Sequence, residues 1–307
     1  MSAPKLPPSF VQLSESVADA KRLGRPILGF ESTIFSELGL PLPHNLECLD
    51  RCLDAADAYG VTPALTAVLD GVAWAGVERS DAAIICGPAK KAAARDLSVA
   101  IGQAWPYGAT TVSASLEICA AAGIEVFATG GIGGVHRGWA ATGDISADLE
   151  ALARHQVVTV SAGAKVFLDL PATLERLETD SVPVLGWQCD EVPGLSRPVK
   201  WPSRCPPGGD RRRSGSNRSS PLGPWPGRAT GCGPGSRDRR PPARRARTGR
   251  RTRPRRRRRG RRNRQRHHPV VLGALADATD GRSIPTNLAL AENNARVGAQ
   301  IAVALAP

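Results

Sequence analysis

The sequence has no apolar run of about 18 residues, the length that a membrane-spanning helix needs. Its first ten residues, MSAPKLPPSF, also lack the basic segment and apolar core of a secretory signal peptide. These two absences predict a cytoplasmic protein that makes no contact with a membrane. The 307 residues would allow one large domain or two ordinary ones, with a sizeable core.

Paired cysteine motifs are absent as well. The seven cysteines are scattered, odd in number and include no CxxC pair, which favours reduced thiols over a disulfide framework. Cys48 and Cys52 would share one face of a helix, but a zinc site needs more ligands than these two. Both are therefore expected to pack as small apolar groups in the core.

Predicted strands and helices alternate along most of the chain. Apolar β-like runs lie at residues 26–32, 62–69, 125–128, 156–162 and 183–187, and helical patterns at 14–23, 45–59, 81–102, 110–122, 146–155, 170–177, 269–278 and 287–305. This alternation predicts an α/β protein with one main domain and a largely parallel sheet flanked by helices. Ligands of such folds gather beyond the carboxyl ends of the strands, where Glu31, Gly130 and Lys165 are predicted to lie.

A glycine cluster follows the predicted strand that ends at Ala128. Thr129 leads into Gly130, Gly131, Ile132, Gly133 and Gly134, and His136 and Arg137 come directly afterwards. Backbone N–H groups in such a loop can hold a phosphate or a carboxylate. A tight turn with a solvated arginine explains the same residues equally well, so both interpretations stay open.

Two carboxylates, Asp144 and Asp148, flank Ser146 at the start of the next predicted helix. One interpretation is structural, because Ser146 or Asp144 can cap the helix while Asp148 complements its dipole. The other is a site for Mg²⁺ or Mn²⁺, which often take only one or two carboxylates and complete their shell with water and substrate oxygens. The spacing does not decide between them.

A single lysine, Lys165, follows the predicted buried strand that ends at Ala162. An amine among small and apolar neighbours can attack a sugar or keto carbon and form a Schiff base. A solvated surface charge is the plainer interpretation of a lysine at a strand end.

Several longer motifs occur in a fixed order: GFESTI at 29–34, GATTVSAS at 108–115, FATGGIGGVHRG at 127–138, DISADL at 144–149, SAGAK at 161–165 and NNAR at 293–296. In these motifs the chain resembles the pseudouridine-5'-phosphate glycosidase family. The resemblance runs from about Pro8 to Asp190 and resumes near His268. Ordered motifs of this length are far more specific than any one of them alone.

The resemblance implies cleavage of the C–C glycosidic bond of pseudouridine 5'-phosphate to uracil and ribose 5-phosphate, with bound Mn²⁺ and a homotrimer as the assembly. It implies that Lys165 is the Schiff-base nucleophile, Glu31 the proton donor and Asp144 the metal ligand. It further implies a set of substrate contacts, which are Lys91, Val112, Ser146, Ala147, Asp148 and Asn287.

One segment differs from the rest in composition. Residues 194–266 hold 26 of the 41 Lys and Arg and only two of the 28 Asp and Glu, so their net charge is +24 while the remainder carries −11. With 11 prolines and no Ile, Phe, Tyr or Met, the segment cannot bury a core and is expected to be disordered as written. The expected organisation is therefore an α/β glycosidase-like part at 1–193, this Arg/Pro/Gly-rich tract at 194–266, and two helices at 267–307 that complete the same domain.

The origin of the tract has two explanations. The tract begins and ends abruptly inside the resemblance, and out-of-frame reading of a GC-rich gene yields mostly Arg, Pro, Gly and Ala, so our hypothesis is a pair of compensating frameshifts. The alternative is an arginine-rich arm of a nucleic-acid-binding protein, which would show steeply salt-dependent binding.

A further hypothesis concerns the activity: the chain is an enzyme, but a Schiff-base lyase that acts on another sugar phosphate.

Overall fold

The computed structural model describes residues 6–165, 167–188, 192–194, 197–199, 230–232 and 283–307. Two predictions lie outside these ranges. They are the helix expected at residues 269–278 and most of the tract at 194–266.

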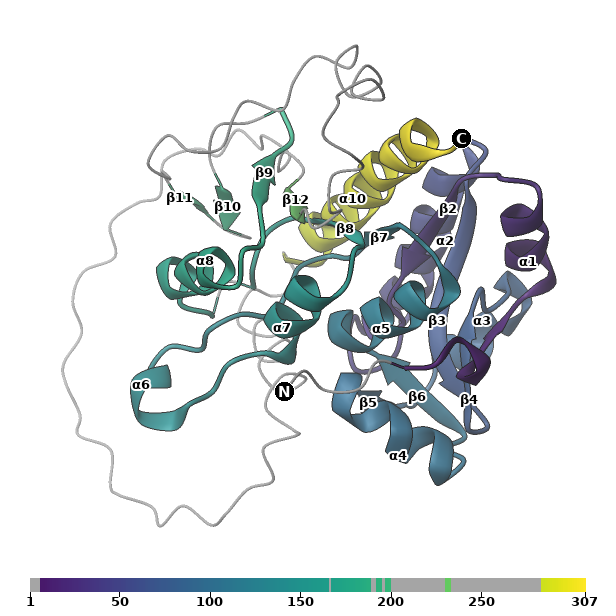
Figure 1. Cartoon of the computed structure of the whole chain (residues 1–307), viewed down its shortest axis with the longest axis horizontal. Helices are drawn as coiled ribbons and strands as arrows, with labels where there is room; N and C mark the ends of the chain where they lie inside the picture. The colour runs from purple at the N-terminus through teal and green to yellow at the C-terminus, as the bar shows by residue number, and fades with distance from the viewer. Residues whose placement is uncertain (1–5, 166, 189–191, 195–196, 200–229, 233–282) are drawn as a thin grey trace.

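A ten-stranded sheet organises the chain (Figure 1). All its pairings are parallel except those of β3 with β4 and with β6, which confirms the predicted largely parallel sheet. The main path runs β1 (Val11–Leu13), β4 (Val72–Ala75), β3 (Thr62–Leu69), β2 (Ile27–Phe30), β7 (Val126–Ala128), β8 (Val158–Ser161), β12 (Thr230–Cys232) and β9 (Val184–Gly186). Off this path, β6 (Tyr107–Thr110) joins β3 to β5 (Lys90–Ala92). A separate antiparallel pair consists of β10 (Val192–Gly194) and β11 (Arg197–Val199).

Helices cover both faces of the sheet. The described helices are α1 (Glu15–Arg22), α2 (His44–Asp57), α3 (Ala82–Ile85), α4 (Leu97–Gly102), α5 (Val112–Ala122), α6 (Trp139–Thr142), α7 (Ala147–Arg154), α8 (Leu170–Thr179) and α10 (Ser283–Leu305), with short 3-10 turns at Pro8–Phe10, Arg79–Asp81 and Ala94–Asp96. No helix in these ranges is long and apolar enough to cross a membrane.

The side chains of the strands alternate between two hydrophobic clusters, as a pleated sheet requires. On β7, Phe127 packs in the cluster that contains α1, α5 and α7, whereas Val126 and Ala128 pack in the cluster that contains α2 and α10. Cys48 and Cys52 lie buried in the second cluster as free thiols, which confirms the prediction that they pack in the core. The strands thus lie between two layers of helices.

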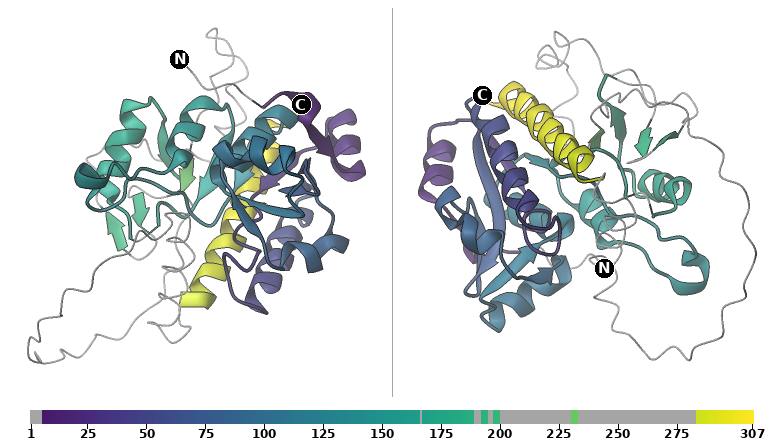
Figure 2. Two further views of the ribbon diagram at one scale, coloured as in Figure 1. Left: turned by 90° about the horizontal axis from the view of Figure 1, so that it is seen from below. Right: turned by 180° about the vertical axis from the view of Figure 1, so that it is seen from behind.

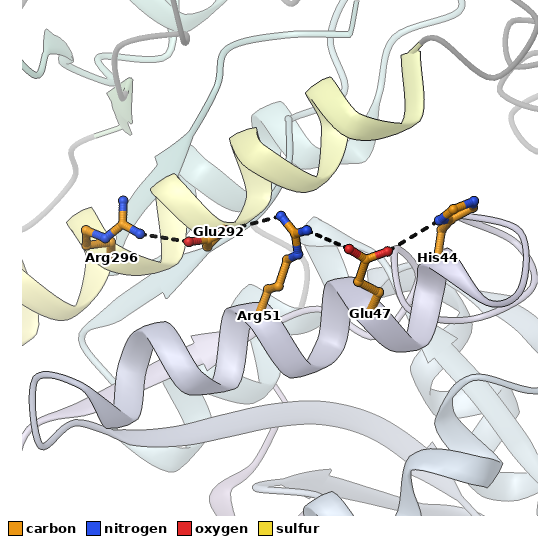
Figure 3. Close-up of polar contacts among 5 residues, drawn as sticks. All are labelled: His44, Glu47, Arg51, Glu292 and Arg296. Carbon is orange, nitrogen blue, oxygen red and sulfur yellow. Dashed lines mark hydrogen bonds and ion pairs between the residues drawn. The ribbon is translucent and has the colours of Figure 1, made fainter.

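The last helix, α10, lies beside α2, and both views of the molecule show the two side by side (Figures 1 and 2). A chain of ion pairs crosses between them (Figure 3). Arg51 contacts Glu47 at 2.6 Å and Glu292 at 3.5 Å, while His44 and Arg296 extend the chain at its two ends. One face of this helix packs in the core, because Ala295 and Ala299 are fully buried there.

The expected helix over residues 81–102 is wrong in its middle. Helical structure is confined to α3 and α4, and Lys90–Ala92 form β5, which pairs with β6 in parallel. Gly87 and Pro88 interrupt the helical pattern, since proline disfavours the helical conformation in the residue before it. Strand pairing then overrides the helix propensity of the alanines that follow.

The strand β6 was not predicted. Thr110 belongs to it, so α5 begins at Val112 rather than at Thr110. The tetrapeptide YGAT carries a glycine and too few apolar residues to signal a strand, and its stability comes from its two neighbours in the sheet.

Candidate active site

Three neighbouring parallel strands, β2, β7 and β8, end at the same edge of the sheet. Glu31 directly follows β2, Thr129 directly follows β7, and Lys165 lies in the loop after β8. The fold therefore brings the carboxyl ends of these strands together as the sequence predicts. The charges of Lys91 on β5 and Asp148 on α7 also act on Glu31.

Glu31 is a buried carboxyl group whose side chain is only 6% exposed. Thr129 donates a hydrogen bond from Oγ1 to Glu31 Oε1. A cavity of about 10 Å³ adjoins it, with largely apolar walls that include Phe30, Phe35 and Cys52. Burial raises the pKa of Glu31, and the positive charge of Lys165 and the bond from Thr129 only partly oppose this. A carboxyl group with a raised pKa can donate a proton near neutral pH.

The other charged groups of the site come from different elements. Lys91 lies in the middle of β5, where burial and the charge of Lys165 lower its pKa and the charge of Asp148 opposes this change. Lys165 is half-buried, and its backbone is bonded to the glycine loop through Lys165 N and Ile132 O at 3.2 Å. The charges of Lys91, Lys165 and Asp148 also act on Glu31. The structure therefore brings these four predicted site residues into one electrostatic group.

Asp148 has a defined structural contact at each oxygen. Its Oδ1 accepts from Ser113 N at 3.0 Å, and its Oδ2 accepts from Gly133 N at 2.8 Å. Ser146 caps α7, because its Oγ accepts from Asp148 N at 3.2 Å. The capping interpretation of Ser146 is confirmed. The buried Asp148 does more than complement a helix dipole, since its two hydrogen bonds join α7 to α5 and to the glycine loop. Ala147 is exposed at the start of α7.

The glycine loop uses most of its N–H groups within the protein. Ile132 N donates to Gly163 O at 3.0 Å, Gly133 N to Asp148, and Gly131 N to Thr129 Oγ1 at 3.4 Å. These donors are not available to an anion, so the geometry favours the tight-turn interpretation over the phosphate cradle.

Asp144 lies apart from the buried carboxylates, on the loop before α7. Its side chain is 64% exposed, and its Oδ2 lies 4.0 Å from Nδ1 of His136. No group of three or more His, Cys, Asp or Glu side chains gathers as metal ligands within the described ranges. A solvent-facing carboxylate does fit a hard divalent cation that takes one protein oxygen and completes its shell with water and substrate oxygens.

Two further predicted contacts have different surroundings. Val112 is the first residue of α5, and its side chain is 1% exposed within the core, so only its backbone could meet a ligand. Asn287 is half-buried near the start of α10.

Sequence reasoning missed the polar groups that support Glu31. Asn294 of α10 is 1% exposed, and its Nδ2 donates to the carbonyl oxygen of Thr129 at 2.8 Å. Asn294 belongs to the NNAR motif and Thr129 directly precedes the glycine cluster, so both could have been found as polar residues inside apolar patterns.

A second support is a cluster of fully buried hydroxyl groups beneath the site. Ser32, the residue after Glu31, shares hydrogen bonds with Thr110, including Thr110 N to Ser32 Oγ at 2.9 Å. Thr110 is bonded in turn to Thr66 and Ser115. These bonds fix the end of β2, and with it the backbone of Glu31, against β3, β6 and α5.

The chain matches one family model and several relatives that share a name. The family described as "Indigoidine synthase A like protein" matches residues 16–198. Pseudouridine-5'-phosphate glycosidase from Chloroflexus aurantiacus is 38% identical over 95% of this chain and 98% of its own length. The protein of the same name from a Roseiflexus species is 40% identical over 96% of each chain.

Two solved structures share the fold. An indigoidine synthase A (IdgA)-like protein from Thermotoga maritima matches with a TM-score of 0.78 and 26% identity over all of both chains. The prealnumycin C-glycosynthase AlnA, solved in complex with ribulose 5-phosphate, matches with a TM-score of 0.76 and 26% identity over 96% of this chain and 97% of that one.

Proposed function

The chain belongs to the indigoidine synthase A like protein family, and from that premise we propose that it is a pseudouridine-5'-phosphate glycosidase. It cleaves the C–C glycosidic bond of pseudouridine 5'-phosphate with water, giving uracil and ribose 5-phosphate, and acts as a lyase on a C-glycoside. Relatives that carry this name match nearly the full length of the chain. The observation that carries the proposal is the group formed by Glu31, Lys91, Asp148 and Lys165, whose charges act on one another beside the ends of β2 and β8.

The bond to be broken explains why a lysine is needed. A C–C glycoside has no leaving heteroatom, so the pair of carboxylates that serves ordinary glycosidases is a poor fit. Once Lys165 is bonded to C1', the lone pair of its nitrogen can form a C1'=N bond as the C1'–C5 bond breaks.

The proposed cleavage proceeds through ring opening and a Schiff base on Lys165. Lys165 Nζ attacks C1' of the ribose, the C1'–O4' bond breaks, and O4' receives a proton, which opens the ring. The nitrogen lone pair then forms a C1'=N bond while the C1'–C5 bond breaks, and C5 of the base receives a proton to give uracil. Water adds to the Schiff base and releases ribose 5-phosphate with the free lysine. Glu31 donates protons in these steps, and its burial and raised pKa suit that role.

The remaining site residues bind and orient the substrate. Lys91 supplies a positive charge for the phosphorylated sugar, and Ser146, Ala147 and Asp148 would contact the substrate at the start of α7. Backbone groups at Val112 and the amide of Asn287 complete the set of substrate contacts. Positioning by several groups keeps C1' within reach of Lys165.

Asp144 would hold one Mn²⁺ ion per subunit, with water in the rest of its shell. When bound, the cation neutralises negative charge on the substrate. Replacing Asp144 with Asn should raise the Mn²⁺ concentration needed for half-maximal activity and leave the thermal midpoint unchanged, since the side chain is exposed.

We also propose that the chain forms a homotrimer and lies in the cytoplasm. Light scattering would test the assembly, and cell fractionation would test the location.

Trapping with borohydride tests the covalent step. Incubation with ribose 5-phosphate and borohydride should add one reduced pentose phosphate to the peptide that contains Lys165, as read by mass spectrometry. The Lys165→Ala variant should remain unlabelled. Equal labelling by unrelated sugar phosphates would point instead to a Schiff-base lyase of different specificity.

A further inference from the structure

A buried cluster of charged side chains lies outside the substrate site, between α5 and α7. Glu117 on α5 is 4% exposed, and it contacts Arg154 Nη2 and lies 3.2 Å from Nε2 of His155. The side chains of Arg154 and His155, at the end of α7, are 14% and 1% exposed. None of the three belongs to the proposed catalytic chemistry.

Burial of such a cluster is not explained by stability. Taking charges out of water costs several kcal/mol per ion, and apolar residues of similar volume often stabilise a fold equally well or better. A charge cluster does provide directional contacts, because its hydrogen bonds fix the orientation of the groups that they join.

The same two helices are joined a second time inside the site. Ser113 N donates to Asp148 Oδ1 at 3.0 Å, which links the first turn of α5 to the first turn of α7. Glu117 lies four residues after Ser113 and therefore on the same face of α5. Arg154 lies six residues after Asp148, about 9 Å farther along α7 at 1.5 Å per residue. Figure 1 shows α5 and α7 next to each other.

Two polar contacts at different levels of a helix pair constrain its crossing angle, in addition to the apolar packing of α7 against α5, which is not directional. We propose that Glu117, Arg154 and His155 are positioning residues, which hold α7 against α5 and thereby fix the Asp148 carboxylate in the substrate site. This inference rests on the proposed function, and it names residues that act through Asp148 rather than on the substrate.

Asp148 is bonded directly to the glycine loop, and its charge acts on two other site residues. Its Oδ2 accepts from Gly133 N at 2.8 Å, so a pivot of α7 would also release the glycine loop. Its charge acts on both Glu31 and Lys91. A shift of about 1 Å in such a group can cost a hundredfold in rate.

The test is a double variant, Glu117→Leu with Arg154→Met, which removes the carboxylate and the guanidinium together, so that neither is left buried without the other. Its thermal midpoint should stay close to that of the parent, since apolar replacement of a buried pair is often neutral. Its kcat for uracil release should nevertheless fall about tenfold or more. Val17→Ala, a core truncation on α1, is the stability control and should keep the parent's kcat.

A second readout does not depend on activity. Ser113 lies in the first turn of α5, where an amide has no acceptor within the helix, so its protection from hydrogen exchange reports its bond to Asp148. The double variant should exchange faster at Ser113 and Gly133 than Val17→Ala does. Unchanged exchange at both amides overturns the inference even if the parent fails to cleave the substrate, and faster exchange with an undiminished kcat overturns the link to catalysis.

Discussion

At the scale of single residues, Glu31 combines burial with ionisable chemistry. Its raised pKa has a consequence for stability as well as for proton donation. A group whose folded pKa lies above its unfolded value stabilises the fold below the unfolded pKa, and this contribution is lost as the pH rises through the folded pKa. The ionised carboxylate therefore weakens the fold at higher pH.

Replacing Glu31 with Gln removes that ionisation and keeps an oxygen that can accept from Thr129. We expect a variant that is more thermally stable than the parent at neutral pH, with a difference that shrinks as the pH falls. Its activity should drop by about 100-fold to 10,000-fold, the usual contribution of a general acid. Thermal midpoints over a pH series and uracil release would check both parts, and a midpoint difference independent of pH would contradict the account.

Gly133 is a residue where any side chain should do harm. A Cβ there would meet Ser146 Oγ and would lie 2.7 Å from Asp148 Oδ2. Gly133→Ala should cost about 1–3 kcal/mol of unfolding free energy, as overpacking does, and should also displace Asp148. Gly102→Ala, in α4 with open space at its Cβ, is the matched control and should be neutral or slightly stabilising in denaturant unfolding.

The sequence was informative about residues that stand at strand ends. Glu31 and Lys165 could be placed beside each other because parallel strands end at one edge of a sheet. Lys91 could not, since its strand β5 exists only through pairing with β6. The bonds of Asp148 to Ser113 and Gly133 likewise depend on how two helices meet, which no local pattern encodes.

At the scale of elements, α10 shows which contacts hold a helix in place. Its ion pair to α2 is partly exposed to solvent, with Arg51 at 44% and Glu292 at 30% side-chain exposure. Its close approach to the sheet is more demanding, because a Cβ on Gly298 would lie 2.8 Å from Cδ1 of the fully buried Leu28. Asn294 of the same helix supports Thr129, so the seating of α10 affects the site.

The two kinds of contact should differ in energy. Arg51→Ala should cost less than about 1 kcal/mol, as for most exposed ion pairs, and the effect should shrink further in salt. Gly298→Val should cost about 1–3 kcal/mol through overpacking against Leu28. Denaturant unfolding at low and high ionic strength would compare them. A larger loss from Arg51→Ala than from Gly298→Val would show that the surface network seats α10.

At the scale of the whole molecule, the charge of the chain is divided sharply. The high isoelectric point of about 10.2 arises from residues 194–266 alone, while the rest of the chain is acidic. The chain nonetheless matches relatives over nearly its full length and theirs. Within the tract, Thr230–Cys232 form β12 between β8 and β9, inside the sheet. An interior parallel strand is normally apolar, which the surrounding composition is not.

The frameshift hypothesis makes a prediction at this scale. The neighbouring reading frame between codons 194 and 266 should encode an ordinary apolar α/β pattern, because the family resemblance resumes after the tract. Resequencing the gene would check it. A neighbouring frame without such a pattern would mean that the tract is a genuine part of this protein.

The central claim concerns the whole enzyme, and uracil release from pseudouridine 5'-phosphate with Mn²⁺ tests it most directly. The parent chain should release uracil together with ribose 5-phosphate in equal amounts. The Lys165→Ala variant, with the same thermal midpoint, should release none above background, because it lacks the amine to which the proposal assigns the Schiff base with C1'. Release by Lys165→Ala at the parent's rate, or no release by the folded parent, would contradict the account.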